Sequence, residues 1–145
     1  MLREPRDRDG AAASVRGMMA ETAGSGAFTF AVVLPDGGTV IGEVSLIRRG
    51  DTSGEIGYVL HPGRQGRGLA TEAVPAMFRL GFDELGLHRI FGRCSARNAA
   101  SARLVGRLGM RREAHLRGSR WVKGEWRDEL VYAILAGEWR LTRSP

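Results

Sequence analysis

A glycine-rich turn between a predicted strand and a predicted helix is the sequence feature that most constrains the fold of this chain. Residues 55–60 (EIGYVL) alternate with a period of two, as in a strand with one buried face. Residues 61–68 (HPGRQGRG) are too rich in Gly and Pro for regular structure. Apolar residues then recur with helical spacing over 69–85, up to Gly86. The order strand, turn, helix predicts an α/β domain in which free backbone amides point outward at the start of the helix.

Turn residues and apolar runs predict further elements on both sides of this unit. The turn PDGG at 35–38 separates two apolar runs and predicts a β-hairpin. We expect additional strands at 27–34, 39–47, 89–94, 112–116, 121–126 and 129–135, and additional helices at 11–23 and 99–108, the second ended by Gly109 in a left-handed conformation. The prediction is therefore an α/β (α+β) fold with a mixed sheet.

Length and composition bound the class of protein. The 145 residues are 43% hydrophobic, which suits one globular domain over 1–145, with the charged residues 1–10 expected to be flexible. The single cysteine, Cys94, excludes an intramolecular disulfide and favours a reducing, cytoplasmic compartment. No apolar run approaches the roughly 18 residues that a membrane helix needs, and the first ten residues do not resemble a signal peptide. We expect a protein that is neither secreted nor membrane-spanning.

Positive charge is concentrated in one part of the chain. Lys and Arg number 22 against 16 Asp and Glu, which gives a net charge of +6, and residues 97–127 alone hold nine basic and two acidic residues. Such a field attracts nucleic acid, a membrane surface or a polyanionic small molecule, and charge alone does not choose among them. The histidines His61, His88 and His115 are 27 residues apart in each step, so they form no metal-ligand cluster and we expect no metal.

Residues 65–70 (QGRGLA) have the features of a phosphate site. They lie where successive backbone amides and the positive end of a helix dipole point outward together. Gly66 and Gly68 let the backbone approach a ligand, and Arg64 and Arg67 add charge at the rim. The segment lacks the Lys-Ser/Thr of a Walker loop and the G-x-G-x-x-G of the dinucleotide fingerprint. Alone, it predicts either a phosphate site or merely a tight connection.

The wider set of motifs separates these two interpretations. The turn matches the acetyl-CoA motif Q/R-x-x-G-x-G/A, and it is accompanied by EIGYVLHP at 55–62, LHRI at 87–90, NAASAR at 98–103 and LGM at 108–110. In their order and spacing these segments resemble the GNAT N-acetyltransferases, and within them the RimJ/RimL-like ribosomal protein acetyltransferases, over about residues 40–135.

This resemblance implies a fold and a co-substrate site. The implied fold is a mixed, mostly antiparallel twisted sheet with a central splayed parallel strand pair and flanking helices. Acetyl-CoA would be the co-substrate, without a metal, with its pyrophosphate on the turn and its pantetheine arm along the strand that ends at Leu60. The residues implied to bind it are Val59, Leu60, Arg64, Gln65, Gly66, Arg67, Gly68, Leu69, Ala70, Thr71, Asn98, Ser101 and Arg103.

The resemblance also implies direct attack of an amine on the thioester, so Cys94 is not needed as a nucleophile. Glu55 is our first choice as general base, through a water, because it shares a strand face with Gly57; Glu43 is the competing candidate, and a surface salt bridge is the alternative role of Glu55. Ser101 falls beside the expected leaving sulfur, although a hydroxyl there also suits a helix cap.

The acceptor is left open, as a protein N-terminus or a small amine, because Arg120 stands where the RimL-like subgroup has an acidic residue. The N-terminal strand and helix region is shorter than in the family, so we expect either a truncated start or an abbreviated acceptor pocket. A homodimer is expected from the family, and Trp121, Trp126 and Trp139 would pack on the sheet or at the dimer contact. Two alternatives are an RNA- or ribosome-binding module that uses residues 97–127 and a non-catalytic acyl-CoA sensor, although nucleic acid is not the expected direct ligand.

Overall fold

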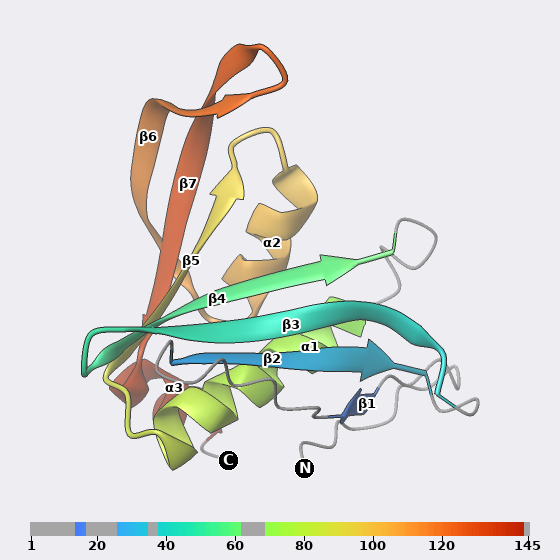
Figure 1. Cartoon of the computed structure of the whole chain (residues 1–145). Helices are drawn as coiled ribbons and strands as arrows, with labels where there is room; N and C mark the ends of the chain where they lie inside the picture. The colour runs from blue at the N-terminus through green and yellow to red at the C-terminus, as the bar shows by residue number, and fades with distance from the viewer. Residues whose placement is uncertain (1–13, 17–25, 35–37, 62–68, 144–145) are drawn as a thin grey trace.

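The computed structural model describes residues 14–16, 26–34, 38–61 and 69–143. They form one mixed sheet of seven strands in the order β1-β2-β3-β4-β5-β7-β6 (Figure 1). The strands are β1 (Ser14–Arg16), β2 (Ala27–Val33), β3 (Val40–Arg49), β4 (Ser53–Leu60), β5 (Arg89–Ser95), β6 (Arg111–Val122) and β7 (Glu125–Leu135). The helices are α1 (Leu69–Phe78), its π-helical continuation η2 (Arg79–Glu84), α2 (Ala99–Arg107) and α3 (Ala136–Arg143).

Strands β2, β3 and β4 form an antiparallel meander, which confirms the predicted hairpin. The predicted face of β4 is also correct, since Ile56 and Leu60 are buried and Gly57 and Val59 are exposed. The strand follows the alternation of the sequence because one face of the meander packs on α1 while the other is open.

The parallel pair β4–β5 is short. Only Ser53, Gly54 and Glu55 pair with residues of β5, the last of them with Phe91, and beyond this point the two strands diverge (Figure 1). Every other strand pair within the described residues is antiparallel. The expected mostly antiparallel sheet with a central splayed parallel pair is therefore confirmed.

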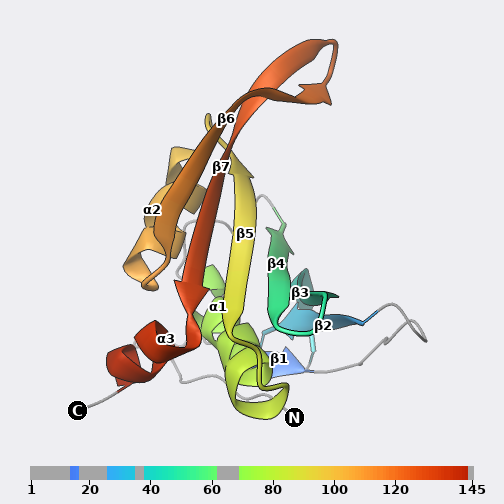
Figure 2. The same cartoon turned by 90° about the vertical axis from the view of Figure 1, so that its left-hand side faces the viewer.

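The core lies between the sheet and the helix that follows the glycine turn. Val74, Met77 and Phe78 of α1 are fully buried, and the Phe78 ring meets Trp139 of α3 edge-on at 5.4 Å. The predicted helix 69–85 is correct in extent, but its last part is π-helical, with the Leu85 amide bonded to the Leu80 carbonyl. Figure 2 shows α1 against one face of the sheet and α3 at its lower end.

The β6–β7 hairpin replaces three predicted strands. The segments 112–116 and 121–126 do not form separate strands, because β6 continues past a register shift between Leu116 and Arg120. The turn falls at Lys123 and Gly124, both with positive φ, 49° and 79°. Gly109 has a φ of 97°, which confirms the predicted left-handed end of α2.

The predicted helix 11–23 is wrong where the structure can be compared with it. Ser14–Arg16 form a strand that pairs antiparallel with β2, Ser14 opposite Val33. The edge of β2 offers unpaired backbone groups, and pairing with them outweighs the weak helical periodicity of this segment. The rest of the predicted helix, like residues 1–10, lies outside the described residues. Among the described helices, none has the length and apolar character to cross a membrane.

Candidate active site

The divergence of β4 and β5 opens a pocket of about 700 Å³. Its walls are residues 56–60 of β4, residues 92–95 of β5 and the first turns of α2. Gly92 faces Ile56 directly after the last β4–β5 pair, and a Cβ there would lie 3.1 Å from the Ile56 Cγ2 atom. Beyond this point the edge of β4 that faces β5 has no strand partner among the described residues. The opening therefore exposes backbone groups of β4 to whatever enters it.

Helix α2 places a polar side chain against β4 inside this pocket. The Asn98 side chain accepts the Ser101 amide at 3.0 Å, which makes Asn98 the N-cap of the helix. This leaves the Ser101 hydroxyl free to meet the Tyr58 hydroxyl at 2.8 Å. Asn98 therefore has the capping role, whereas Ser101 presents its hydroxyl to the pocket.

Two titratable groups beside Ser101 stay protonated at neutral pH. Burial raises the pKa of Tyr58, and the hydrogen bond with Ser101 offsets this only in part. Burial also raises the pKa of the Cys94 thiol, with a smaller opposing effect of Ser101. Tyr58 can therefore donate a proton or hydrogen bond, and Cys94 is held as a thiol, a poor nucleophile.

The predicted co-substrate residues are distributed around this pocket. Val59, Leu60, Thr71, Asn98, Ser101 and Arg103 line it, and 66% of the Val59 surface is exposed. Leu69 and Ala70 begin α1, and Thr71, the next residue of this helix, lines the pocket. Arg64, Gln65, Gly66, Arg67 and Gly68 lie outside the described residues. The described part of the predicted site thus comes together in one place, while the role of the turn stays a prediction.

The two candidate bases lie on one face of the sheet at different distances from the open end. Glu55 sits at the closed end, bound to Arg49 at 3.0 Å and to Arg93 at 3.6 Å, and it is not among the residues that line the pocket. Glu43 pairs with Val59 across β3 and β4 and is exposed, and it does not line the pocket either. The salt-bridge alternative for Glu55 describes these contacts, and its catalytic role stays a prediction.

Several residues that line the pocket were not among the predicted site residues, and Tyr58, Tyr132 and Arg120 are three of them. Tyr58 and Tyr132 line the pocket from β4 and β7, and Arg120 reaches it from β6. Tyr58 could have been found from the alternation of EIGYVL, which puts it on the buried face. Tyr132 and Arg120 depend on how the β6–β7 hairpin folds over β5, which no local pattern indicates.

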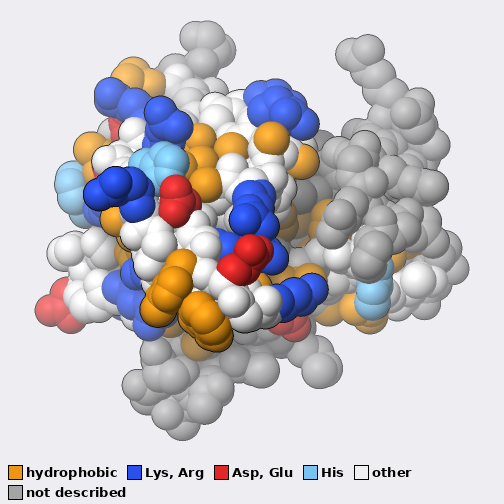
Figure 3. All heavy atoms as spheres, turned by 90° about the horizontal axis from the view of Figure 1, so that it is seen from above, with side chains coloured by type: hydrophobic (Ala, Val, Ile, Leu, Met, Phe, Trp, Pro, Cys, Tyr) orange, Lys and Arg blue, Asp and Glu red, His pale blue; other side chains and the backbone are white. Residues whose placement is uncertain are grey.

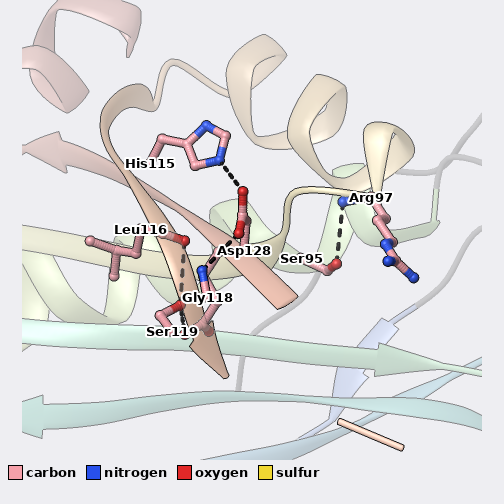
Figure 4. Close-up of polar contacts among 8 residues, drawn as sticks. Ser95, Arg97, His115, Leu116, Gly118, Ser119 and Asp128 are labelled. Atoms are coloured by element: carbon pink, nitrogen blue, oxygen red, sulfur yellow. Dashed lines mark hydrogen bonds and ion pairs between the residues drawn. The ribbon is translucent and has the colours of Figure 1, made fainter. Parts of the chain in front are cut away.

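A polar cluster lies at the register shift within the β6–β7 hairpin (Figure 4). The Asp128 carboxylate accepts the Gly118 amide at 2.7 Å and contacts the His115 Nε2 atom at 2.8 Å. The Gly118 amide and the His115 side chain lower the pKa of Asp128. The Ser119 hydroxyl donates to the Glu129 carboxylate at 3.0 Å. Among the described residues, no three His, Cys, Asp or Glu side chains are grouped so as to hold a metal ion.

Sequence comparison places this chain in a known family. The acetyltransferase (GNAT) domain matches residues 1–111. The chain belongs to the GNAT acetyltransferase family. It is 39% identical over 117 residues to the uncharacterized N-acetyltransferase YnaD of Bacillus subtilis, covering 80% of this chain and 69% of YnaD. It is 30% identical over 116 residues to the ribosomal protein uS5-alanine N-acetyltransferase of Escherichia coli, covering 78% of this chain and 60% of that GNAT relative.

Solved GNAT structures share the fold. An acetyltransferase of Bacillus anthracis has 35% identity and a TM-score of 0.70, over 75% of this chain and 66% of that chain. The spermidine/spermine N-acetyltransferase SpeG of Vibrio cholerae, in complex with manganese ions, has 26% identity and a TM-score of 0.76, over 85% of this chain and 72% of that one. The chain spans about 60% of the length of several curated relatives.

Proposed function

We propose that this protein transfers an acetyl group from acetyl-CoA to a primary amine. The observation that carries the proposal is the opening between β4 and β5, where the paired hydroxyls of Tyr58 and Ser101 meet. The volume of the pocket and its mixture of apolar walls with Asn98, Thr71 and Arg103 suit a long thioester with amide and phosphate groups. The family relationship supports the same co-substrate.

The residues of this chain would supply hydrogen bonds and a proton. Bound acetyl-CoA supplies the acyl group: a C–N bond to the amine forms, the C–S bond breaks, and the sulfur takes a proton as it leaves. The exposed backbone of β4 near Val59 donates to the carbonyl oxygen as it gains negative charge. The Tyr58–Ser101 pair delivers the proton to the sulfur, because the raised pKa of Tyr58 keeps its proton in place.

The base is proposed to act from the other face of β4. Both oxygens of Glu55 are held by arginine side chains, which leaves few lone pairs for a proton. Glu43, opposite Val59 and without an ion-pair partner among the described residues, is the stronger candidate on geometry. Glu43→Gln and Glu55→Gln compared at saturating acceptor assign the role, since the base variant loses kcat with unchanged CoA affinity.

A peptide α-amine is the acceptor that needs the least help from a base. At pH 7 a Lys amine with a pKa near 10.4 costs about 4.6 kcal/mol to deprotonate, and an α-amine near 7.8 costs about 1.1 kcal/mol. The uS5-alanine enzyme is a relative with an α-amine acceptor in its name, and SpeG is one with a polyamine in its name. We therefore put protein N-termini first and polyamines second.

Calorimetry with CoA followed by a screen of amines for CoA release tests the proposal. We expect CoA to bind at micromolar concentrations, and short peptides with varied first residues to release thiol. Absence of CoA binding would refute the proposal, whereas binding without turnover on any amine would favour an acyl-CoA sensor. A single 1–145 domain, a cytoplasmic location and a homodimer stay predictions, to be checked by limited proteolysis, fractionation and light scattering.

A further inference from the structure

A second, smaller pocket of about 220 Å³ adjoins the first beyond the end of β5. The two pockets share Ser95 and Arg120, so Arg120 stands between them. The rest of the second pocket comes from the β6–β7 hairpin, with Arg127 and Glu129 among its residues. Ser95 pairs with Glu129 across β5 and β7, which places this pocket beside the last residues of β5.

The charged groups of this pocket are engaged, with one exception. Arg127 donates to Glu125 at 3.0 Å. Asp128 accepts from Gly118 and contacts His115, as Figure 4 shows, and the Glu129 carboxylate accepts from the Ser119 hydroxyl. Arg120 has no ion pair and no side-chain hydrogen bond within the described residues.

The surroundings of Arg120 favour an anion. Arg120 and Arg127 are directly opposite each other on β6 and β7, so two guanidinium groups share one face. Arg127 is already paired with Glu125, so Arg120 is the guanidinium of this pocket that has no anion among the described residues. A guanidinium has five donors and no acceptor, and its planar fork matches a carboxylate.

We infer that the acceptor carries a carboxylate within one or two residues of its reactive amine, and that Arg120 binds it. The inference rests on the proposed acetyl transfer and specifies the acceptor of that same site. The amine would reach the opening between β4 and β5, while the carboxylate stays on Arg120, which lines both pockets. Arg120 thereby becomes a specificity-determining residue at a position where the resemblance suggested an acidic one.

The test measures the binding of matched peptide amides by calorimetry, with and without saturating CoA. Ala-Asp-Gly-Gly and Ala-Gly-Asp-Gly are compared with their Asn counterparts and with Ala-Lys-Gly-Gly, and spermidine serves as the polycation. We expect one Asp peptide to bind roughly tenfold more tightly than its Asn counterpart, and the ratio to fall with added salt. Spermidine should bind more weakly than either.

Variants at exposed positions assign the preference. Arg120→Gln should bring the Asp to Asn ratio to about one, and Arg120→Glu should turn the preference towards the Lys peptide. Arg112→Gln is the matched control, because Arg112 is an exposed arginine on the same strand outside both pockets, and it should leave the ratio unchanged. Equal loss of the ratio in Arg112→Gln would overturn the assignment to Arg120.

The same samples separate this inference from the proposed function through CoA release. Selective binding of Asp peptides without CoA release would refute the proposed acetyl transfer and support the anion site at Arg120. CoA release with equal binding of Asp and Asn peptides would support the proposed acetyl transfer and overturn the inference about Arg120. If Arg120→Gln weakens CoA binding and changes no peptide ratio, Arg120 serves the co-substrate and the inference also fails.

Discussion

At the scale of single residues, the hydroxyls of Tyr58 and Ser101 connect a strand and a helix that are 43 positions apart in the sequence. The sequence pointed to Ser101 and Asn98 through the family resemblance. For Tyr58, the alternation of residues 55–60 indicated only that it lies on the buried face of its strand. A pair of this kind depends on the angle at which α2 crosses the open end of the sheet, and local pattern carries no information about that angle.

Removal of either hydroxyl should lower the rate of acetyl transfer without unfolding the protein. We expect Tyr58→Phe and Ser101→Ala to reduce kcat by roughly 100-fold or more, the lower end of the range for one proton-transfer group. The double variant should lose little more than the worse single variant, because the two groups act as one unit. CoA release at saturating acceptor measures kcat, and circular dichroism checks the fold. Additive losses would contradict a shared role.

A glycine of β3 determines how close β4 can approach. A Cβ on Gly42 would lie 2.1 Å from the Val59 carbonyl oxygen, which is backbone and cannot turn aside. Gly42→Ala should destabilise the protein by about 3 kcal/mol or displace the end of β4.

Gly106 in α2 provides the matched control for this substitution. A Cβ there meets nothing within 4 Å among the surrounding atoms, and the residue lies inside a helix. Gly106→Ala should therefore stabilise by about 0.5–1 kcal/mol. Urea unfolding measures the change in the free energy of unfolding of Gly42→Ala, expected to be a loss, and of Gly106→Ala, expected to be a gain. A destabilised Gly106→Ala would show that the helix argument is wrong.

At the scale of elements, the two ends of the prediction fared worst. The helix predicted at 11–23 is a strand at Ser14–Arg16, and α3 was not predicted at all. Helix α3 has eight residues, too few for a periodic signal. The signal present is Glu138 three positions after Leu135, since a carboxylate at the third helical position can bond back to the N-cap amide.

Glu138 stabilises α3 in a pH-dependent way. Its carboxylate accepts the Leu135 amide at 3.0 Å and two guanidinium bonds from Arg111 at 2.7 and 2.8 Å. The Leu135 amide first, and Arg111 second, lower the pKa of Glu138 from its ordinary value of 4.5. A carboxyl whose folded pKa is lowered contributes stability that is present above pH 4.5 and is lost as pH falls through the folded value.

Glu138→Ala should therefore destabilise by about 1 kcal/mol at neutral pH, the usual loss for a helix cap. The difference from the unchanged protein should shrink as pH falls below 4.5. Glu138→Gln keeps an acceptor oxygen and loses the charge, so it should retain part of the stability. Thermal unfolding at a series of pH values from about 3 to 8 measures the stability of the unchanged protein and of both variants. A stability difference between Glu138→Ala and the unchanged protein that grows at low pH would contradict the predicted pH dependence.

At the scale of the whole molecule, the sequence located the charge but not its surroundings. The basic residues of 97–127 spread over α2 and the β6–β7 hairpin, and Figure 3 shows Lys and Arg side chains beside hydrophobic ones on this face. Part of this charge is compensated, since Arg97 and Arg127 both bind Glu125. Trp121 and Trp126 are 59% and 63% exposed and lie edge to face against each other, so they stay outside the core, whereas Trp139 is buried in it.

The mostly antiparallel sheet and its splayed parallel pair were predictable because the family resemblance covered most of the chain. The alternation of β4 and the glycine at the end of α2 were predictable from local chemistry. The contacts of Glu55 with Arg49 and Arg93 were not, since they join side chains of three strands and depend on the β4–β5 register. Residue roles that need the assembled sheet are the ones that sequence reasoning leaves open.

The three-pair seam between β4 and β5 has a consequence for local stability. Beyond the Glu55–Phe91 pair, β4 and β5 have no hydrogen-bonded ladder between them within the described residues, although residues on both sides belong to one core. The amides of β4 and β5 that face the opening therefore find their hydrogen-bond partners in solvent or in a ligand. In amide hydrogen exchange we expect these amides to exchange fastest among the central strands. A ligand that fills the opening takes the place of the missing ladder. Its free energy of binding should then slow the hydrogen exchange of amides in both β4 and β5.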